Sequence, residues 1–172
     1  MISTIGCPTD NVNVYCSMQK WPSELSFHAI TSFLKFTNDK VVARLANVSK
    51  QDGGSDCGLF AIAYAETLLR GLDPVNLVFN QEVMRAHLIR CLESGVIGPF
   101  PVQCQRTVRR QYVRQHTVAL YCKCRTSYVR GDQMVACNKC HKWFHCRCVG
   151  LTQEDFDGLR KDKGKKFFCD TC

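Results

Sequence analysis

The last third of the chain carries eight cysteine and histidine side chains whose spacing suits metal binding. They form four short pairs, with one, two, two and two intervening residues: Cys122 and Cys124, Cys137 and Cys140, His145 and Cys148, Cys169 and Cys172. Zinc takes four sulfur or imidazole ligands in a tetrahedron, and a tight turn brings both members of a close pair to one ion. Four pairs therefore predict two Zn2+ ions as cofactors.

The order of these ligands, four cysteines followed by a histidine and three cysteines, resembles that of the PHD finger. The stretches Trp143-Phe144-His145 and Cys148-Val149-Gly150-Leu151 resemble the core of the same family. The resemblance spans residues 121–172 and implies a cross-braced fold. It implies one zinc site of Cys122, Cys124, His145 and Cys148, and another of Cys137, Cys140, Cys169 and Cys172. The two residues between Cys137 and Cys140 disfavour the RING finger, the main alternative.

Three aromatic residues and a methionine occupy positions that matter in this family: Tyr121, Tyr128, Met134 and Trp143. In PHD fingers that read histone tails, these positions line a cage around a trimethylated lysine. A quaternary ammonium ion is attracted to the faces of aromatic rings, and a thioether adds a polarisable wall. The resemblance thus implies a methyl-lysine reader. The alternative is that Tyr128 and Met134 are packing residues and that Trp143 supports the zinc site.

One position departs from the family pattern. Many such fingers carry an aspartate directly after the third cysteine, where its carboxylate holds an arginine that precedes the methylated lysine. This chain has Asn138 there, and Asp132 is the candidate replacement. We expect the partner to be a histone tail peptide or another protein. If no histone peptide binds, the finger is a structural zinc module that binds another protein.

A second candidate site lies in the first half, where a cysteine precedes an apolar helix. The stretch Gln51-Asp52-Gly53-Gly54-Ser55-Asp56-Cys57-Gly58 resembles the signature of Ulp-type proteases, which act on SUMO and ubiquitin-like proteins. A helix dipole lowers the pKa of a thiol at the helix N-terminus, and a glutamine amide can donate to an oxyanion. The resemblance, from Ile2 to Pro101, implies that Cys57 is the nucleophile and Gln51 the oxyanion donor.

The catalytic base of such a protease is missing from this sequence. In the family the histidine lies on the strand before the aspartate, a position that falls upstream of Met1, and Cys16 occupies the aspartate position. Neither His28 nor His87 fits the pattern. A thiol nucleophile needs an oriented imidazole base, so we expect an inactive protease remnant. The alternative is a deconjugating cysteine peptidase that the finger directs to chromatin, with a ubiquitin-like protein as its second partner.

Hydrophobic periodicity predicts strands near the N-terminus. Period-two alternation covers Met1–Ile5 and Asn11–Ser17, and Val41–Val48 forms either a third strand or a helix. The prolines of Gly98-Pro99-Phe100-Pro101 end regular structure. We therefore expect an α+β fold in three parts: a truncated, partial Ulp-like cysteine protease domain at 1–101, a basic linker at 102–120 and a PHD-type zinc finger at 121–172.

Apolar patterning and capping residues predict three helices: Gly58–Arg70 before Gly71, Gln81–Glu93 between Asn80 and Gly95, and Thr152–Leu159 with Thr152 as its N-cap. The last of them should pack Leu151, Phe156 and Leu159 beneath the finger.

Composition indicates the cellular setting. The 13 cysteines are either grouped as metal ligands or scattered singly, which fits a reducing compartment. The net charge of +8 belongs to the second half, because residues 1–101 carry eight basic and nine acidic groups. Basic residues there could favour an anionic partner such as chromatin. No apolar run approaches the roughly 18 residues of a membrane span. We expect a nuclear protein without a membrane partner or direct binding to nucleic acid.

Overall fold

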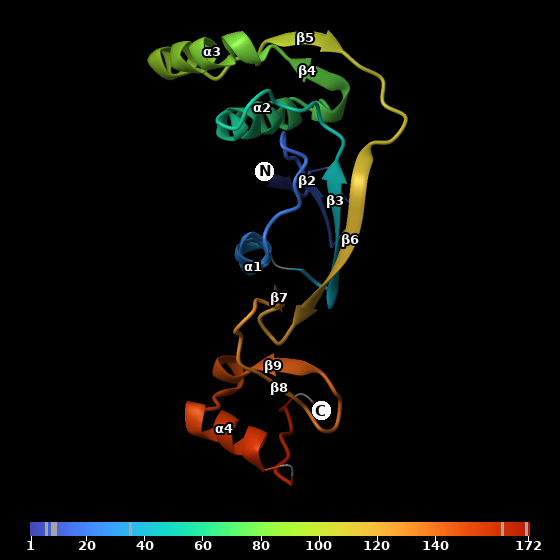
Figure 1. Cartoon of the computed structure of the whole chain (residues 1–172), viewed down its shortest axis with the longest axis vertical. Helices are drawn as coiled ribbons and strands as arrows, with labels where there is room; N and C mark the ends of the chain where they lie inside the picture. The colour runs from blue at the N-terminus through green and yellow to red at the C-terminus, as the bar shows by residue number, and fades with distance from the viewer. Residues whose placement is uncertain (6, 8–9, 35, 163, 171) are drawn as a thin grey trace. The chain divides into compact units, whose positions relative to one another are not determined.

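The computed structural model describes residues 1–5, 7, 10–34, 36–162, 164–170 and 172, which fall into two compact units. Unit 1 combines Met1–Pro22 with Val42–His116, and unit 2 combines Ser23–Val41 with Thr117–Cys172 (Figure 1). The sequence placed boundaries near residues 101 and 121. The structure instead groups a segment of the first half, Ser23–Val41, with the finger.

A small sheet begins unit 1. Its strands follow the order β1 (Ile2–Ser3), β2 (Asn11–Val14), β3 (Lys40–Ala46) and β6 (Tyr112–Tyr121). β1 and β2 are antiparallel, whereas β2 and β3 are parallel. The ambiguous segment at 41–48 is therefore mainly a strand, and its alternate residues Ala43 and Leu45 are buried, as a period of two requires.

Helices and a short antiparallel strand pair supply the rest of unit 1: α2 (Cys57–Leu69), η1 (Pro74–Asn76), β4 (Leu77–Phe79), α3 (Gln81–Ser94) and β5 (Val102–Gln105). The rings of Phe60, Tyr64 and Phe79 meet in the core with centroids 5.8–6.1 Å apart. Each such buried side chain contributes about 1.5–3 kcal/mol to stability. Both helices predicted here are confirmed, and Gly71 and Gly95 follow them at positive φ.

Two elements differ from the sequence-based expectation. The segment expected to be a linker contains β5 and most of β6. In addition, a helix that the apolar pattern did not indicate, α1 (Glu24–Phe33), follows the N-cap Ser23. A helix of 10 residues is marginal alone and depends on packing. Of the helices that the structure describes, none is long and apolar enough to cross a membrane.

Unit 2 consists of α1, the end of β6, β7 (Thr126–Ser127), β8 (Met134–Ala136), β9 (Trp143–His145), η2 (Cys146–Val149) and α4 (Gln153–Lys161). β7 pairs antiparallel with β6, and β8 pairs antiparallel with β9. Among the described residues, the buried hydrophobic cluster of the finger consists of Phe144, Cys137 and Cys169. So small a core cannot by itself stabilise a fold of this size.

Helix α4 begins as predicted but packs differently. Thr152 and Asp155 form a reciprocal capping box at its N-terminus. The expected packing of Leu151, Phe156 and Leu159 beneath the finger is only partial, because all three are half-buried and α4 has no fully buried residue. The Arg160 guanidinium carbon lies 5.7 Å from the centroid of the Phe156 ring. This cation–π contact gives the ring a favourable partner at the surface.

Candidate metal centres and aromatic pocket

The first candidate metal centre brings together the donor atoms of Cys122, Cys124, His145 and Cys148, all within 4.8 Å of one another. Cys122 and Arg125 have positive φ values of 65° and 50°, which turn the chain tightly enough to aim both cysteines of the first pair inward. Cys124 Sγ lies 3.2 Å from His145 Nδ1. This geometry selects Nδ1 as the donor atom of the imidazole.

The other nitrogen of His145 faces an acidic side chain. His145 is 2% exposed, and its Nε2 lies 3.6 Å from the Asp132 carboxylate, slightly beyond hydrogen-bond length. Burial lowers the pKa of His145, and the charge of Asp132 only partly opposes this effect. The imidazole is therefore neutral, with its proton facing Asp132 and Nδ1 free for a metal.

The second candidate centre joins Cys137, Cys140, Cys169 and Cys172, whose sulfur atoms again lie within 4.8 Å of one another. Individual sulfur–sulfur distances are 3.5 Å (Cys137 to Cys172), 3.7 Å (Cys140 to Cys169) and 3.2 Å (Cys169 to Cys172). A zinc–sulfur bond of about 2.3 Å gives a tetrahedral edge of roughly 3.8 Å. The four sulfur atoms thus enclose a space that fits one zinc ion.

Within each centre, the thiol groups alter one another's pKa values. Burial opposes ionisation of Cys137, but backbone N–H groups of Lys139 and Cys169 donate to its sulfur and the pKa falls to about 5. Hydrogen bonding to Cys169 and then Cys137 raises the pKa of Cys172 to about 12. In the first centre, the pKa of Cys148 is raised to about 11, mainly by burial. A divalent cation removes this conflict, because it stabilises every thiolate at once.

The two groups of four are the same as those that the family resemblance implied, and together they fit two zinc ions, one held by three cysteines and a histidine and one by four cysteines. Cys146 lies between two ligands in sequence but belongs to neither group, and it is buried at 2% exposure. His141 adopts a positive φ of 58° and lines a neighbouring pocket instead of a metal centre.

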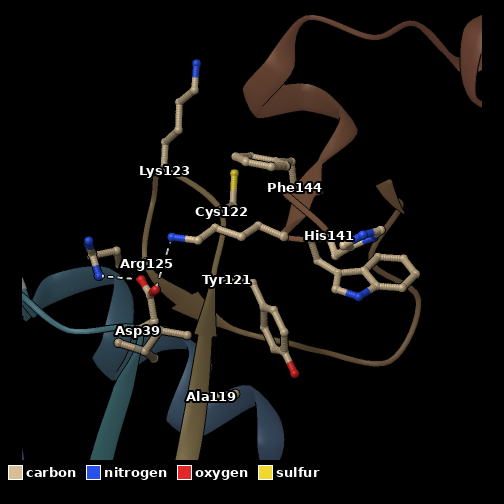
Figure 2. A pocket seen from close by; sticks show the side chains of 11 residues that line it. Asp39, Ala119, Tyr121, Cys122, Lys123, Arg125, His141 and Phe144 are labelled. Carbon is tan, nitrogen blue, oxygen red and sulfur yellow. Dashed lines mark hydrogen bonds and ion pairs between the residues drawn. The ribbon is translucent and has the colours of Figure 1, made fainter. Parts of the chain in front are cut away.

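That pocket, of about 490 Å³, is where two of the expected cage residues meet. Tyr121 ends β6, Trp143 begins β9, and the Cys122 N–H donates to the Trp143 carbonyl at 3.0 Å, which holds the two aromatic residues side by side. Both side chains line the pocket (Figure 2). Trp143 is 49% exposed, although it is a large aromatic residue next to a metal ligand. About half of the Trp143 side chain therefore remains accessible and is not buried in the core.

The other two expected cage residues, Met134 and Tyr128, do not line this pocket. Met134 begins β8 opposite His145, two pairs along from Trp143, which lies opposite Ala136. Residues opposite one another on paired strands share a face of the sheet, so Met134 and Trp143 project from the same face. Tyr128 follows β7 and is 46% exposed.

Helix α1 holds the backbone directly before Tyr128. The Ser127 N–H donates to Thr31 Oγ1 at 3.0 Å, and His28 Nδ1 donates to the Ser127 carbonyl at 2.8 Å. Ser127 is 4% exposed, so water does not compete for these bonds. Both backbone groups of Ser127 are thus fixed by side chains from α1, which anchors the loop that carries Tyr128.

One edge of the β8–β9 ladder is open. The Cys146 N–H donates to the Gln133 carbonyl, and the Cys137 N–H donates to the Lys142 carbonyl. Because hydrogen-bonding direction alternates along an antiparallel pair, the N–H and C=O groups of Met134 and Ala136 face the opposite edge. Among the residues that the structure describes, no strand pairs with β8 on that side.

Both candidates for holding an arginine already make contacts within the finger. The Asn138 side-chain oxygen accepts from the Phe167 N–H at 2.9 Å, and the Asn138 N–H donates to the Phe167 carbonyl at 2.8 Å. Asn138 therefore ties the second metal centre to the C-terminal segment. Asp132 faces His145 and accepts from the Val129 N–H at 2.8 Å. Both residues have structural tasks that the sequence did not reveal.

The residues expected to resemble a protease site lie in unit 1. Cys57 is exposed and is the first residue of α2, as the sequence indicated. The Gln51 side chain is 8% exposed and is held at both ends, because its oxygen accepts from Ser17 Oγ at 2.5 Å and its amide donates to the Gly53 carbonyl at 3.1 Å. Cys16 is half-buried.

Each histidine of the chain has contacts of its own. His28 is bonded to Ser127, His87 to Gly98, and His116 stacks edge-on against Trp21 at 4.6 Å; His141 lines the aromatic pocket and His145 belongs to the first metal centre. None of these contacts involves Cys57, for which the structure offers no imidazole partner among the described contacts.

Comparison with known proteins identifies the C-terminal segment. Residues 118–172 match a family described as "Pygopus, PHD-type zinc finger". The chain is 38% identical over 55 residues to the chromatin remodeling protein SHL and 42% identical over 55 residues to the chromatin remodeling protein EBS, both of Arabidopsis thaliana. It is 34% identical over 58 residues to the nucleosome-remodeling factor subunit NURF301 of Drosophila melanogaster.

These matches cover 32%, 32% and 34% of this chain but only 22%, 21% and 2% of SHL, EBS and NURF301. The chain thus spans about a fifth or less of the length of these relatives. Residues 118–172 form a PHD-type zinc finger with two zinc sites. The resemblance of residues 1–101 to Ulp-type proteases gains no support from the matched family, which covers the finger alone.

Proposed function

We propose that the finger binds a histone tail in the nucleus and recognises a trimethylated lysine on it. The observation that carries this proposal is the placement of Tyr121 and Trp143 on one pocket, with Trp143 half exposed. Two aromatic faces that are already held beside each other attract a quaternary ammonium ion without a cost of rearrangement. Met134, which shares a sheet face with Trp143, and the exposed Tyr128 are the further cage residues that we propose, although neither lines the pocket itself.

The open edge of β8 gives the rest of the tail a place to bind. An extended peptide can pair with the free N–H and C=O groups of Met134 and Ala136 and become the third strand of the β8–β9 sheet. Side chains of such a peptide alternate between the two faces. One face carries Trp143, so a lysine in the appropriate register projects toward the aromatic pocket.

The relatives support a chromatin setting for this reader. SHL and EBS are chromatin remodeling proteins, and NURF301 is a nucleosome-remodeling factor subunit. A finger of the same family in this chain is consistent with a nuclear location and a histone partner. Because Asn138 and Asp132 are both engaged, recognition rests on the methylated lysine and the backbone of the tail more than on a neighbouring arginine.

Calorimetric titration of the zinc-loaded full chain tests the proposal. The ligands are the amino-terminal peptide of histone three, unmodified and trimethylated on its fourth-position lysine. We expect heat of binding with the trimethylated peptide and a much weaker signal with the unmodified one, because the cage interaction depends on the weakly hydrated cation. Equal affinity for the two peptides would overturn the recognition of the methylated lysine, and no binding of either would leave a structural zinc module that binds a different protein.

A second candidate function is favoured by the position of Cys57. Its thiol is exposed at the N-terminus of α2, and Gln51 lies a few residues before it. These two residues would be the remnant of a deconjugating peptidase that acts on a ubiquitin-like protein. The proposal stops at a remnant, because the contacts of Cys57 include no histidine and Cys16 stands in the aspartate position.

We therefore expect no peptidase turnover. A ubiquitin-like protein with a thiol-reactive C-terminal group should leave Cys57 unlabelled, and a fluorogenic conjugate should remain intact. The reason is that, among the described contacts, no histidine is placed beside Cys57 to act as its general base. Labelling detected by mass spectrometry that disappears in Cys57→Ser, together with cleavage of the fluorogenic conjugate, would establish the peptidase instead.

A further inference from the structure

The aromatic pocket contains more positive charge than a site for a cation should tolerate. Besides Tyr121 and Trp143, its lining includes the basic side chains of Lys123, Arg125 and Lys142. A methylated lysine is itself positively charged, and like charges at this range repel. The pocket therefore needs a compensating negative charge if it is to accept such a ligand.

Lys123 is neutralised outside the pocket. Its ammonium group pairs with the Asp170 carboxylate at 2.5 Å, and Figure 2 shows its side chain extending away from Asp39 and Arg125. The pair raises the pKa of Lys123, chiefly through the hydrogen bond to Asp170, so the two charges persist together. Arg125 and Lys142 remain as the cations that face the pocket.

Asp39 forms ion pairs with both of these cations, and its single negative charge offsets one of their two positive charges. Its two carboxylate oxygens pair separately, Oδ1 with Arg125 at 2.8 Å and Oδ2 with Lys142 at 3.4 Å, and Figure 2 shows both contacts converging on one carboxylate. Asp39 is the sole acidic side chain in the pocket lining that the structure describes. It comes from the segment between α1 and β3, far from the finger in sequence, and belongs to the same compact unit.

The backbone of Asp39 is fixed in place. Its carbonyl accepts the Leu120 N–H at 2.9 Å, one residue before Tyr121. On the same segment, α1 is anchored to Ser127 through Thr31 and His28. The carboxylate is therefore held at the pocket by contacts with β6 and β7, and its position does not depend on the ion pairs alone.

These ion pairs have little to do with folding. The side chains of Asp39, Arg125 and Lys142 are 59%, 39% and 66% exposed. Ion pairs this exposed contribute little to stability because water and salt screen them. Their influence on a charged ligand in the adjoining pocket is different in kind, since it requires only that the summed charge near the ligand changes.

We propose that Asp39, supplied by the N-terminal half, is a specificity-determining residue of the reader pocket: by pairing with Arg125 and Lys142 and offsetting one of their two positive charges, it lowers the positive potential of the pocket between Tyr121 and Trp143 and so favours a cationic ligand. This inference rests on the proposed function for its biological ligand. It also predicts that Asp39 makes the electrostatic potential at Trp143 less positive, which can be tested without any histone peptide.

The first arm of the test is calorimetry on the zinc-loaded full chain with the trimethylated peptide. Asp39→Asn should weaken binding about five-fold at low salt, the effect of one uncompensated charge several ångströms away at intermediate dielectric. The loss should shrink below about two-fold at high salt because of screening. Adding Arg125→Gln and Lys142→Gln to Asp39→Asn removes both cations and should raise affinity to at least the parent value. Asp157→Asn, on α4 away from the pocket, is the matched control and should change nothing.

The second arm uses the fluorescence of Trp143 as a probe of the pocket. The chain has two tryptophans, so the measurement is made in a Trp21→Phe background, where Trp143 is the only one left. Adding Asp39→Asn should increase quenching by iodide about two-fold and decrease quenching by caesium, because the local potential becomes more positive. Adding Arg125→Gln and Lys142→Gln should reverse the change.

The two arms separate the possible failures. If the parent chain binds no methylated peptide but the quenching ratio changes as described, the proposed histone ligand is wrong and the role of Asp39 in the pocket stands. If the parent chain binds and Asp39→Asn alters neither affinity nor quenching, the role of Asp39 is overturned. A loss of binding that neither salt nor the triple variant reverses would also overturn it, because it would show a structural effect.

Discussion

Replacing Cys169 by serine should release zinc from the second centre and unfold the finger. Cys169 lies 3.7 Å and 3.2 Å from two other sulfur ligands and also forms part of the small core with Phe144. Structural zinc contributes on the order of 10–16 kcal/mol to folding in zinc-finger peptides. The parent chain should hold two zinc ions by native mass spectrometry, and Cys169→Ser should hold one at most.

Cys146→Ala is the matched control for this prediction. Cys146 is 2% exposed, like the ligand His145, and lies between His145 and Cys148, but it belongs to neither metal group. Its loss should leave both ions bound. Chelation of the parent chain should likewise unfold the finger while unit 1, which has its own aromatic core, keeps its helical signal. If Cys169→Ser retained two ions, or Cys146→Ala lost one, the assignment of ligands would be wrong.

Zinc retention should also weaken as pH falls. Each thiol must lose its proton to bind the metal, and the pKa of Cys148 and of Cys172 in the metal-free centres is raised to about 11 and about 12. Protons therefore compete with zinc for these sulfur atoms, and the competition strengthens with acidity. Cys137, whose pKa is lowered to about 5, should be the last thiol of its centre to take up a proton.

The metal ligands were readable from the sequence because each pair is local. Two cysteines separated by one or two residues reach the same ion through a single turn, so spacing alone identifies them. Which pairs combine is not a local property, and there the family resemblance supplied the answer that the geometry then matched. The helices of unit 1 were predictable for a related reason, since Gly71 and Gly95 mark their ends through local backbone conformation.

The setting of the pocket could not be predicted in this way. The contact between Asp39 and Arg125 joins residues 86 positions apart, and no pattern in either segment refers to the other. The helix α1 was missed because its stability comes from Phe27 and Thr31, which are buried in the folded chain, and not from a strong apolar period. From the sequence, Asn138 stands where an aspartate would hold an arginine, whereas in the structure it forms hydrogen bonds with Phe167.

Trp143→Ala should abolish the preference for a trimethylated lysine while leaving both zinc ions in place. The indole is half exposed and lines the pocket, whereas the backbone of Trp143 provides the bond to Cys122 and is unchanged by the substitution. A desolvated cation–π contact contributes about 2 kcal/mol, so binding of the trimethylated peptide should fall at least about thirty-fold. Binding of the unmodified peptide should hardly change, because it uses the open edge of β8.

Two further variants are the controls for this measurement. Trp143→Phe keeps an aromatic face and should retain part of the preference, since the weaker quadrupole of phenylalanine still attracts the cation. Phe168→Ala removes an exposed aromatic residue of the same unit that does not line the aromatic pocket, and it should retain all of it. If Trp143→Ala kept its selectivity by calorimetry with two zinc ions bound, the cage would lie elsewhere on the finger. The pocket between Tyr121 and Trp143 would then have to serve a different ligand.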